Sequence, residues 1–111
     1  MNEVALITGA ARGIGQAFAK RLAQDGFTIA LLDRLDCQAT AKLVHEAGSE
    51  AHTFRADLSE KEDINRVATE VQSQLGSVDV LVNNAGILLN KSAGRMRSGR
   101  DVPGLTKSVN V

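Results

Sequence analysis

The sequence has 111 residues, which is enough for one domain, and its 43% hydrophobic and 23% charged residues are ordinary for a globular protein. Thirteen basic side chains balance 13 acidic ones, which argues against nucleic acid or an anionic membrane as the main partner. No apolar run approaches the roughly 20 residues of a membrane span. The N-terminus shows no leader-like pattern and the single cysteine cannot form an internal disulfide, so we expect a cytoplasmic protein.

Patterns of buried strands alternate with helical patterns as far as residue 82. Continuous apolar runs predict strands that are buried on both faces, and one alternating run predicts a further strand. Apolar residues three or four positions apart predict helices between them. In chain order, the expected elements are a strand at 4–8, a helix from 13 to just before Gly26, a strand at 27–32, a helix at 37–47, a strand at 51–55, a third helix, and a strand at 78–82. The third helix begins at a capping box formed by Ser59 and Glu62, and it ends at Gly76.

This alternation predicts an α/β fold, namely a Rossmann-type doubly wound parallel sheet with helices on both faces. The expected order of the four strands is 3-2-1-4, which opens a crevice at the carboxyl ends of the first and fourth strands. Residues 1–87 form this β-α-β-α-β-α-β half. Residues 88–111 are basic, glycine-rich and irregular, and we interpret them as an incomplete remainder of the same domain. The fourth strand would then lie at an open edge of the sheet.

Three glycines lie at the predicted crevice, between the first strand and the first helix. A pyrophosphate needs backbone N–H donors, a positive field and room, and a tight turn into a helix N-terminus provides all three. Gly9 suits the turn, Gly13 lets phosphate oxygens come close, and Gly15 lets the helix pack tightly on the strand. Their G-x-x-x-G-x-G spacing differs from the common G-x-G-x-x-G dinucleotide pattern. The stretch therefore predicts a phosphate-binding turn with its own spacing.

Four short motifs each follow or end a predicted strand. They are Thr8-Gly9-Ala10-Ala11-Arg12-Gly13-Ile14-Gly15, then Asp33, then Asp57-Leu58, and last Asn83-Asn84-Ala85-Gly86. In this order, they resemble the motifs of the short-chain dehydrogenase/reductase family over residues 2–86. The resemblance implies an NAD(P)-dependent oxidoreductase that transfers a hydride between nicotinamide and a carbonyl or alcohol substrate.

The choice of cofactor depends on residues around the second strand. Asp33 lies roughly 20 residues beyond Gly15, where a ribose-binding acid is expected. A carboxylate accepts hydrogen bonds from both ribose hydroxyls and repels a 2′-phosphate, which favours NAD. Two arginines favour the alternative, NADP. The resemblance implies this for Arg12, because NADP-preferring members of the family often have a basic residue just before the second motif glycine. Arg34 follows the second strand, where an arginine could pair with a 2′-phosphate. We weigh the acid more heavily and expect NAD.

The resemblance alone assigns the remaining cofactor residues. It implies that Asp57 accepts a hydrogen bond from the adenine amino group with Leu58 against the ring, although Asp57 could instead cap the following helix. It also implies that the adenosine side is lined by Asn84, Ala85 and Gly86. The polar amides of Asn83 and Asn84 can tie neighbouring loops together. The other expected cofactor residues are Thr8, Gly9, Ala11, Arg12, Gly13, Ile14, Gly15 and Asp33.

Hydride transfer also needs a general acid or base at the reacting oxygen. In the family, this chemistry involves a serine, a Tyr-x-x-x-Lys motif and an asparagine, but the 111 residues contain no tyrosine. Asn110 lies about where the family's relay asparagine falls, and it is the catalytic residue that the resemblance assigns. We therefore expect the cofactor-binding portion of a longer enzyme, which acts on a small molecule as a homo-oligomer.

Two other functions stay open. Without a tyrosine, the chain could be a non-catalytic nucleotide-binding or interaction module. Other Rossmann-like enzymes, such as methyltransferases, also combine a glycine-rich turn with an acid after the second strand, although Asn-Asn-Ala-Gly after the fourth strand counts against them. His45 and His52 have no partner at metal-ligand spacing, so we expect no metal, and Cys37 is expected to be a structural or surface thiol.

Overall fold

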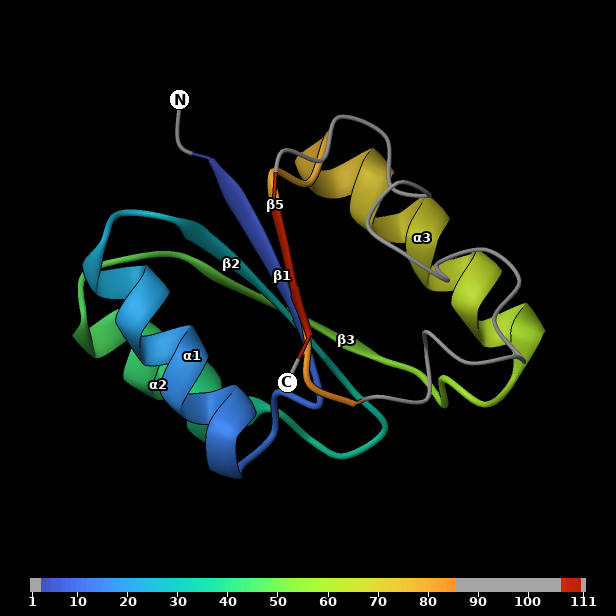
Figure 1. Cartoon of the computed structure of the whole chain (residues 1–111), viewed down its shortest axis with the longest axis horizontal. Coiled ribbons are helices and arrows are strands. Elements are labelled where there is room, and N and C mark those ends of the chain that lie inside the picture. The colour runs from blue at the N-terminus through green and yellow to red at the C-terminus, as the bar shows by residue number, and fades with distance from the viewer. Residues whose placement is uncertain (1–2, 86–106, 111) are drawn as a thin grey trace.

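The computed structural model describes residues 3–85 and 107–110 (Figure 1). The helices are α1 (Gly13–Gln24), α2 (Gln38–Glu46) and α3 (Lys61–Leu75). The strands are β1 (Val4–Thr8), β2 (Thr28–Asp33), β3 (Ala51–Arg55), β4 (Val80–Asn83) and β5 (Lys107–Asn110). Each element predicted from the sequence is present, with ends that shift by one or a few residues.

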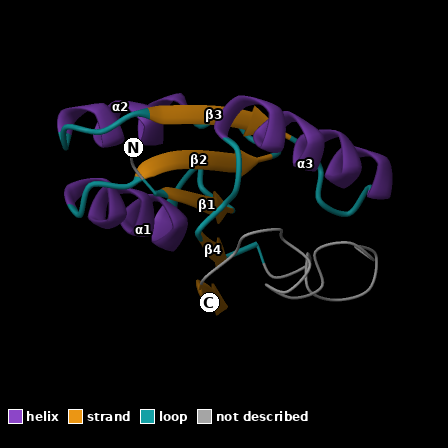
Figure 2. Ribbon diagram, turned by 90° about the horizontal axis from the view of Figure 1, so that it is seen from above, coloured by secondary structure: helices purple, strands orange, loops and turns teal. Residues whose placement is uncertain are grey.

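The strands form a parallel sheet in the order β3-β2-β1-β4-β5. Helices α1 and α2 lie on one face of this sheet and α3 lies on the other (Figures 1 and 2). Alternate residues of β1 face the two layers, because Val4 and Leu6 pack in the core cluster of α3, whereas Ala5 and Ile7 pack in that of α1 and α2. Strand β1 is buried along its whole length, as the central strand of a Rossmann-type doubly wound sheet.

The order predicted for the first four strands is confirmed, and a fifth strand continues it. β5 pairs in parallel with β4, with Lys107 beside Val80 and Asn110 beside Asn83. The expectation that the fourth strand lies at an open edge is therefore wrong. The sequence pattern did not reveal β5 because its four residues, Lys-Ser-Val-Asn, include one apolar side chain. A segment of this length is too short to show a side-chain period, and the strand is defined by its backbone pairing with β4.

The start of α3 differs from the predicted capping box. Its N-cap position is Glu60, and no side chain caps the helix there. Ser59 instead donates its hydroxyl to the carboxylate of Asp57, at 2.6 Å. Asp63, in the first turn of the helix, accepts a hydrogen bond from the backbone N–H of Asp57, at 2.9 Å. These polar side chains therefore order the loop before the helix.

Cys37 lies at the N-cap of α2 and is buried in the cluster on the α1 and α2 face. Its thiol donates a weak hydrogen bond to the carbonyl of Leu35, at 3.8 Å. Burial, followed by the negative charges of Asp33 and Asp36, raises the pKa of this thiol from 9.0 to about 11. Cys37 is thus a structural thiol that the fold keeps protonated.

This raised pKa predicts an alkaline loss of stability. The unfolded chain ionises the thiol near pH 9, whereas the folded protein keeps it protonated up to about pH 11, so the folded state holds more protons in that interval. We expect the free energy of unfolding to fall as the pH rises from about 9 to about 11, and a Cys37→Ala variant to lose this part of the dependence. Urea unfolding of both proteins measures it, and equal slopes against pH would contradict the prediction.

Candidate functional site

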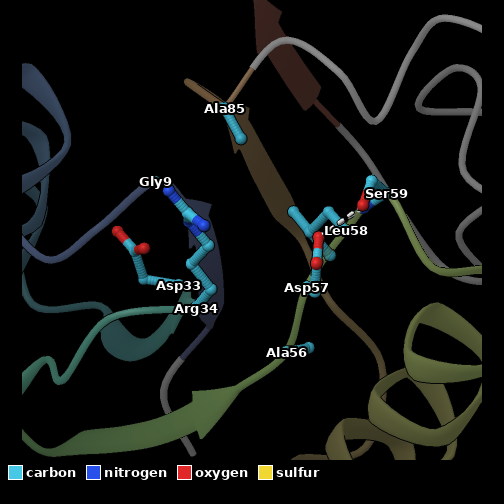
Figure 3. Close-up of a pocket in the computed structure, with 8 residues that line it drawn as sticks. All are labelled: Gly9, Asp33, Arg34, Ala56, Asp57, Leu58, Ser59 and Ala85. Atoms are coloured by element: carbon cyan, nitrogen blue, oxygen red, sulfur yellow. Dashed lines mark hydrogen bonds between the residues drawn. The ribbon is translucent and has the colours of Figure 1, made fainter.

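A pocket of about 390 Å³ opens at the carboxyl ends of the first four strands (Figure 3). Its lining comes from four loops: Gly9 after β1, Asp33 and Arg34 around the end of β2, Ala56, Asp57, Leu58 and Ser59 after β3, and Ala85 after β4. Figure 3 shows Asp33 and Arg34 on one side of the pocket and Asp57 with Leu58 on the other. The pocket lies at the predicted crevice and brings together residues from all four sequence motifs.

The turn between β1 and α1 packs too closely to admit side chains at two positions. Gly9 has a φ of 65°, and a Cβ built there would lie 2.9 Å from Nδ2 of Asn84 and 3.2 Å from N of Ala85. A Cβ on Gly15 would collide with the carbonyl oxygen of Gly9, a backbone atom that no side-chain rotation can move. The start of α1 is therefore in backbone contact with the turn, and Asn84 lies against both.

Unlike Gly9 and Gly15, Gly13 has open space where a side chain would lie. Apart from its chain neighbours and the backbone of its own helix, no atom of the described residues lies within 4 Å of a Cβ at this position, and its φ of 63° also favours glycine. Its neighbours Arg12 and Ile14 are exposed, with 56% of Ile14 accessible. The first N–H groups of a helix have no acceptor within it, and the first turn of α1 contains no acidic side chain. The helix start therefore offers donors and a positive field to an anion near Gly13.

The two alanines before this helix use their N–H groups inside the protein. Ala10 donates to the carbonyl of Leu32 in β2 at 3.3 Å, and Ala11 donates to Oδ2 of Asp33 at 2.9 Å. Because both donors are already bonded, they are not available to an anion, and the start of α1 offers donors that have no acceptor within the helix. The structure thus places Ala11, a predicted cofactor residue, in the framework of the turn.

Thr8 joins the turn after β1 to the loop after β4. Its buried hydroxyl donates to Oδ1 of Asn83 at 3.0 Å, and it accepts the N–H groups of Asn84 and Ala85 at 3.0 and 3.1 Å. Asn84 donates its side-chain amide to the carbonyl of Gly9 at 3.0 Å. The prediction that the two asparagines tie neighbouring loops together is confirmed. Thr8 itself, also a predicted cofactor residue, is buried and is not among the residues that line the pocket.

Asp33 connects the glycine turn to the loop after β2. Its Oδ2 accepts the N–H of Ala11, and its Oδ1 accepts the N–H of Leu35 at 3.0 Å. These bonds fix the half-buried carboxylate at the edge of the pocket. Each oxygen of a carboxylate can accept more than one hydrogen bond, so Asp33 can also accept from a ligand hydroxyl.

Asp57 and Arg34 lie on opposite sides of the pocket (Figure 3). Ser59 donates its hydroxyl and its N–H to Oδ1 of Asp57, at 2.6 and 3.0 Å. These bonds, the hydroxyl first, lower the pKa of Asp57, and the charge of Arg34 lowers it further. The carbonyl of Arg34 accepts two hydrogen bonds from the guanidinium of Arg55, at 3.1 and 3.3 Å. Both charged residues therefore sit on loops that the protein itself orders.

Some predicted residues lie elsewhere or outside the described part of the chain. Gly86 is outside the described residues, and so is the side chain of Asn110, whose backbone pairs with Asn83. Arg12 is exposed at the N-cap of α1. Of the two arginines considered for NADP, Arg34 lines the pocket and Arg12 does not.

Three polar residues around the site were not identified from the sequence. Ser59 was assigned to a helix cap, although its position two residues after Asp57 is also typical of an Asx turn. Gln16 and Thr40 bond to the carbonyl groups of the glycine turn, and 24 positions separate them in the chain. No local pattern marks a contact between residues so far apart.

Within residues 3–85 and 107–110, no group of three His, Cys, Asp or Glu side chains could hold a metal ion. No helix in these ranges is long and apolar enough to cross a membrane. His45 is exposed on α2, and His52 is half-buried on β3. The charged groups that line the pocket belong to Asp33, Arg34 and Asp57.

Substitution of the two glycines at the helix start is expected to destabilise the protein for different reasons. Gly15→Ala forces a methyl group against the carbonyl of Gly9, so we expect it to lower the free energy of unfolding by about 1–3 kcal/mol, despite the helix preference of alanine. Gly13→Ala has room, and we expect only the roughly 1–2 kcal/mol cost of a left-handed φ. Urea unfolding measures both, and a Gly15→Ala protein as stable as the wild type would contradict the close packing.

Comparison with known proteins gives the same picture as the motifs. A family model described as short chain dehydrogenase matches residues 3–102. The 3-oxoacyl-[acyl-carrier-protein] reductase FabG of Staphylococcus epidermidis is 38% identical over 100 residues, which cover 87% of this chain and 41% of the relative. The chain thus spans about two fifths of the length of this curated relative.

Two solved structures are similar to the chain in fold and sequence. The 3-oxoacyl-[acyl-carrier protein] reductase from Brucella melitensis, in complex with NAD, has a TM-score of 0.73 and 36% identity, over 78% of this chain and 34% of that one. The alcohol dehydrogenase from the archaeon Thermococcus sibiricus, complexed with 5-hydroxy-NADP, has a TM-score of 0.69 and 39% identity, over 74% of this chain and 36% of that one. The matched family model, the sheet order and the strand-end motifs agree, and the chain therefore belongs to the short-chain dehydrogenase/reductase family.

Proposed function

We propose that this chain is the cofactor-binding portion of an NAD(P)-dependent oxidoreductase. The whole enzyme would transfer a hydride between nicotinamide and a carbonyl or alcohol group of a small-molecule substrate. The convergence of four strand ends on one pocket supports this proposal most strongly, because it places the glycine turn beside Asp33, Asp57 and Leu58. The relatives described above include a reductase whose structure contains NAD and an alcohol dehydrogenase whose structure contains 5-hydroxy-NADP.

The groups around the pocket fit the adenosine and pyrophosphate parts of a dinucleotide. The open space at Gly13 allows phosphate oxygens to approach the first N–H groups of α1. Asp33 offers a fixed carboxylate for ribose hydroxyls. Leu58 beside Asp57 combines an apolar surface with a hydrogen-bond acceptor, which suits a flat base that carries an amino group.

NAD is the cofactor that we propose, with NADP as the alternative. The carboxylate of Asp33 favours a ribose diol and repels a 2′-phosphate, and its two backbone hydrogen bonds hold it at the pocket edge. The alternative is supported by Arg34, whose guanidinium could pair with a 2′-phosphate from the same side of the pocket. We give Asp33 more weight because both of its oxygens are anchored.

When bound, the nicotinamide ring supplies or accepts the hydride. The residues of this chain would hold the cofactor at its adenosine and pyrophosphate end. A proton must also move at the reacting oxygen, and the 111 residues contain no tyrosine to move it. We assign a supporting role in proton relay to Asn110, whose backbone pairs with Asn83 at the end of β4. The serine, the Tyr-x-x-x-Lys motif and the substrate site would belong to the rest of a longer, homo-oligomeric enzyme.

Fluorescence titration of the 111-residue chain with NADH and NADPH tests cofactor binding and its selectivity. We expect both reduced dinucleotides to bind, and NADH to bind more tightly. Arg34→Met keeps an apolar stem but removes the charge beside the pocket, so NADPH binding should weaken about tenfold while NADH binding changes by less than about twofold.

Arg21→Met is the matched control for this titration. Arg21 is an exposed arginine near the far end of α1 that pairs with Asp25, and its loss should leave both affinities unchanged. Failure of the wild-type chain to bind either dinucleotide would contradict the proposed function. Tighter binding of NADPH than of NADH would indicate that the cofactor is NADP and not NAD.

The absence of tyrosine favours one competing function, a non-catalytic nucleotide-binding module. Such a module would bind NADH, and a longer native protein that contains this chain would not oxidise NADH with any carbonyl substrate.

A methyltransferase would instead bind S-adenosylmethionine. Since a ligand that binds only the folded state raises the Tm, thermal unfolding with each ligand separates the two cofactor classes, and we expect stabilisation by NADH alone.

A further inference from the structure

Thr40 places a buried hydroxyl directly beneath the glycine turn. It is the third residue of α2, and its side chain has no exposed surface. The hydroxyl lies 2.7 Å from the carbonyl oxygen of Ala10 and 3.2 Å from that of Ala11. One hydroxyl has one proton to donate, and the shorter distance assigns that proton to Ala10.

Gln16 supplies the second donor. This residue lies in the first turns of α1, and its Nε2 is 3.4 Å from the carbonyl oxygen of Ala11 and 3.1 Å from the hydroxyl oxygen of Thr40. The two protons of the amide can serve both acceptors. Gln16 therefore completes the hydrogen bonding of Ala11 and of Thr40 together.

These contacts leave the peptide groups of Ala10 and Ala11 with partners at every polar atom. On the other side of the turn, their N–H groups are bonded to Leu32 and Asp33 of β2, as described above. The turn is thus held between strand β2 and helix α2, both of which follow it in the chain. Neither Thr40 nor Gln16 is among the residues that line the pocket.

We propose that Thr40 and Gln16 are positioning residues for cofactor binding, which fix the Ala10–Ala11 segment so that the following N–H groups of α1 and the carboxylate of Asp33 are ready for the dinucleotide. This inference rests on the proposed function. A ligand that binds a turn which is already fixed does not lose free energy in ordering that turn. The two side chains therefore contribute to affinity without touching the ligand. The geometry that they set is the position of the Ala10–Ala11 segment. Thr40 bonds to the carbonyl of Ala10, Gln16 bonds to the carbonyl of Ala11, and the N–H of Ala11 bonds to Asp33.

Substitution of Thr40 tests the inference through the Kd of the folded 111-residue chain for NADH. Thr40→Val keeps the shape of the side chain but removes its hydroxyl, and we expect NADH binding to weaken about tenfold. Thr40→Ser restores the hydroxyl and should bind within about twofold of the wild type. Thr28→Val is the matched control, because Thr28 is buried at the opposite end of β2 from Asp33, and its affinity should equal that of the wild type.

A purely structural role for Thr40 gives a different result. Thr40→Val would then lower the urea midpoint of unfolding, but the protein that remained folded would bind NADH as the wild type does, and this outcome overturns the inference. If Thr40→Val does not fold, Gln16→Leu replaces it, because Gln16 is only half-buried. We expect Gln16→Leu to weaken NADH binding about threefold, and unchanged binding again overturns the inference.

The same experiment separates the inference from the proposed function. If the wild-type chain binds neither NADH nor NADPH, the proposed function fails, and the inference fails with it. If the wild type binds NADH and Thr40→Val binds it equally well, only the positioning role fails.

Discussion

The close backbone contact between Gly9 and Gly15 is the constraint on which the rest of the site depends. The carbonyl oxygen of Gly9 occupies the space that a Cβ of residue 15 would need, and it also accepts the side-chain amide of Asn84. This one oxygen, at the end of β1, therefore contacts both the start of α1 and the loop after β4. The parallel pairing of Thr8 with Asn83 brings these segments level with one another. With them fixed, the first turn of α1 lies beside the crevice, where its unpaired N–H groups and its dipole favour an anion.

Polar side chains from several elements hold the turn in place. Buried polar groups need hydrogen-bond partners, and here side chains from neighbouring elements supply them for the carbonyl groups of the turn and for Oδ1 of Asn83. Thr8 bonds to Asn83 at the end of β4 and to the two residues that follow it. Thr40 of α2 and Gln16 of α1 bond to the carbonyl groups of the turn. Asp33 differs because it is anchored to Ala11 and Leu35 and still lines the pocket. A substitution at Asp33 that is meant to change cofactor choice would therefore also disturb the glycine turn.

Much of this arrangement follows from local sequence patterns, and the rest depends on contacts between distant residues. Continuous apolar runs identified β1 and β2, because strands covered on both faces exclude polar side chains. The glycine spacing and the strand-end acids located the pocket. The pattern did not reveal β5, which has too few apolar residues to show a period, or the role of Ser59, whose helix-cap spacing fits an Asx turn equally well. Thr40 and Gln16 were also missed, because only the packing of α1 against α2 brings them together.

The proposed function requires that the glycine turn and the ends of β2, β3 and β4 form one dinucleotide site within this chain. Titration of the ¹⁵N-labelled 111-residue chain with NADH, followed by two-dimensional amide NMR spectra, tests it directly. The account predicts that amide shifts change at Gly13, Ile14 and Gly15, near Asp33, at Asp57 and Leu58, and at Ala85, with one saturation curve for all of them. Saturable shifts confined to another face of the sheet, or shifts at the glycine turn without any at Asp33 and Asp57, would contradict it.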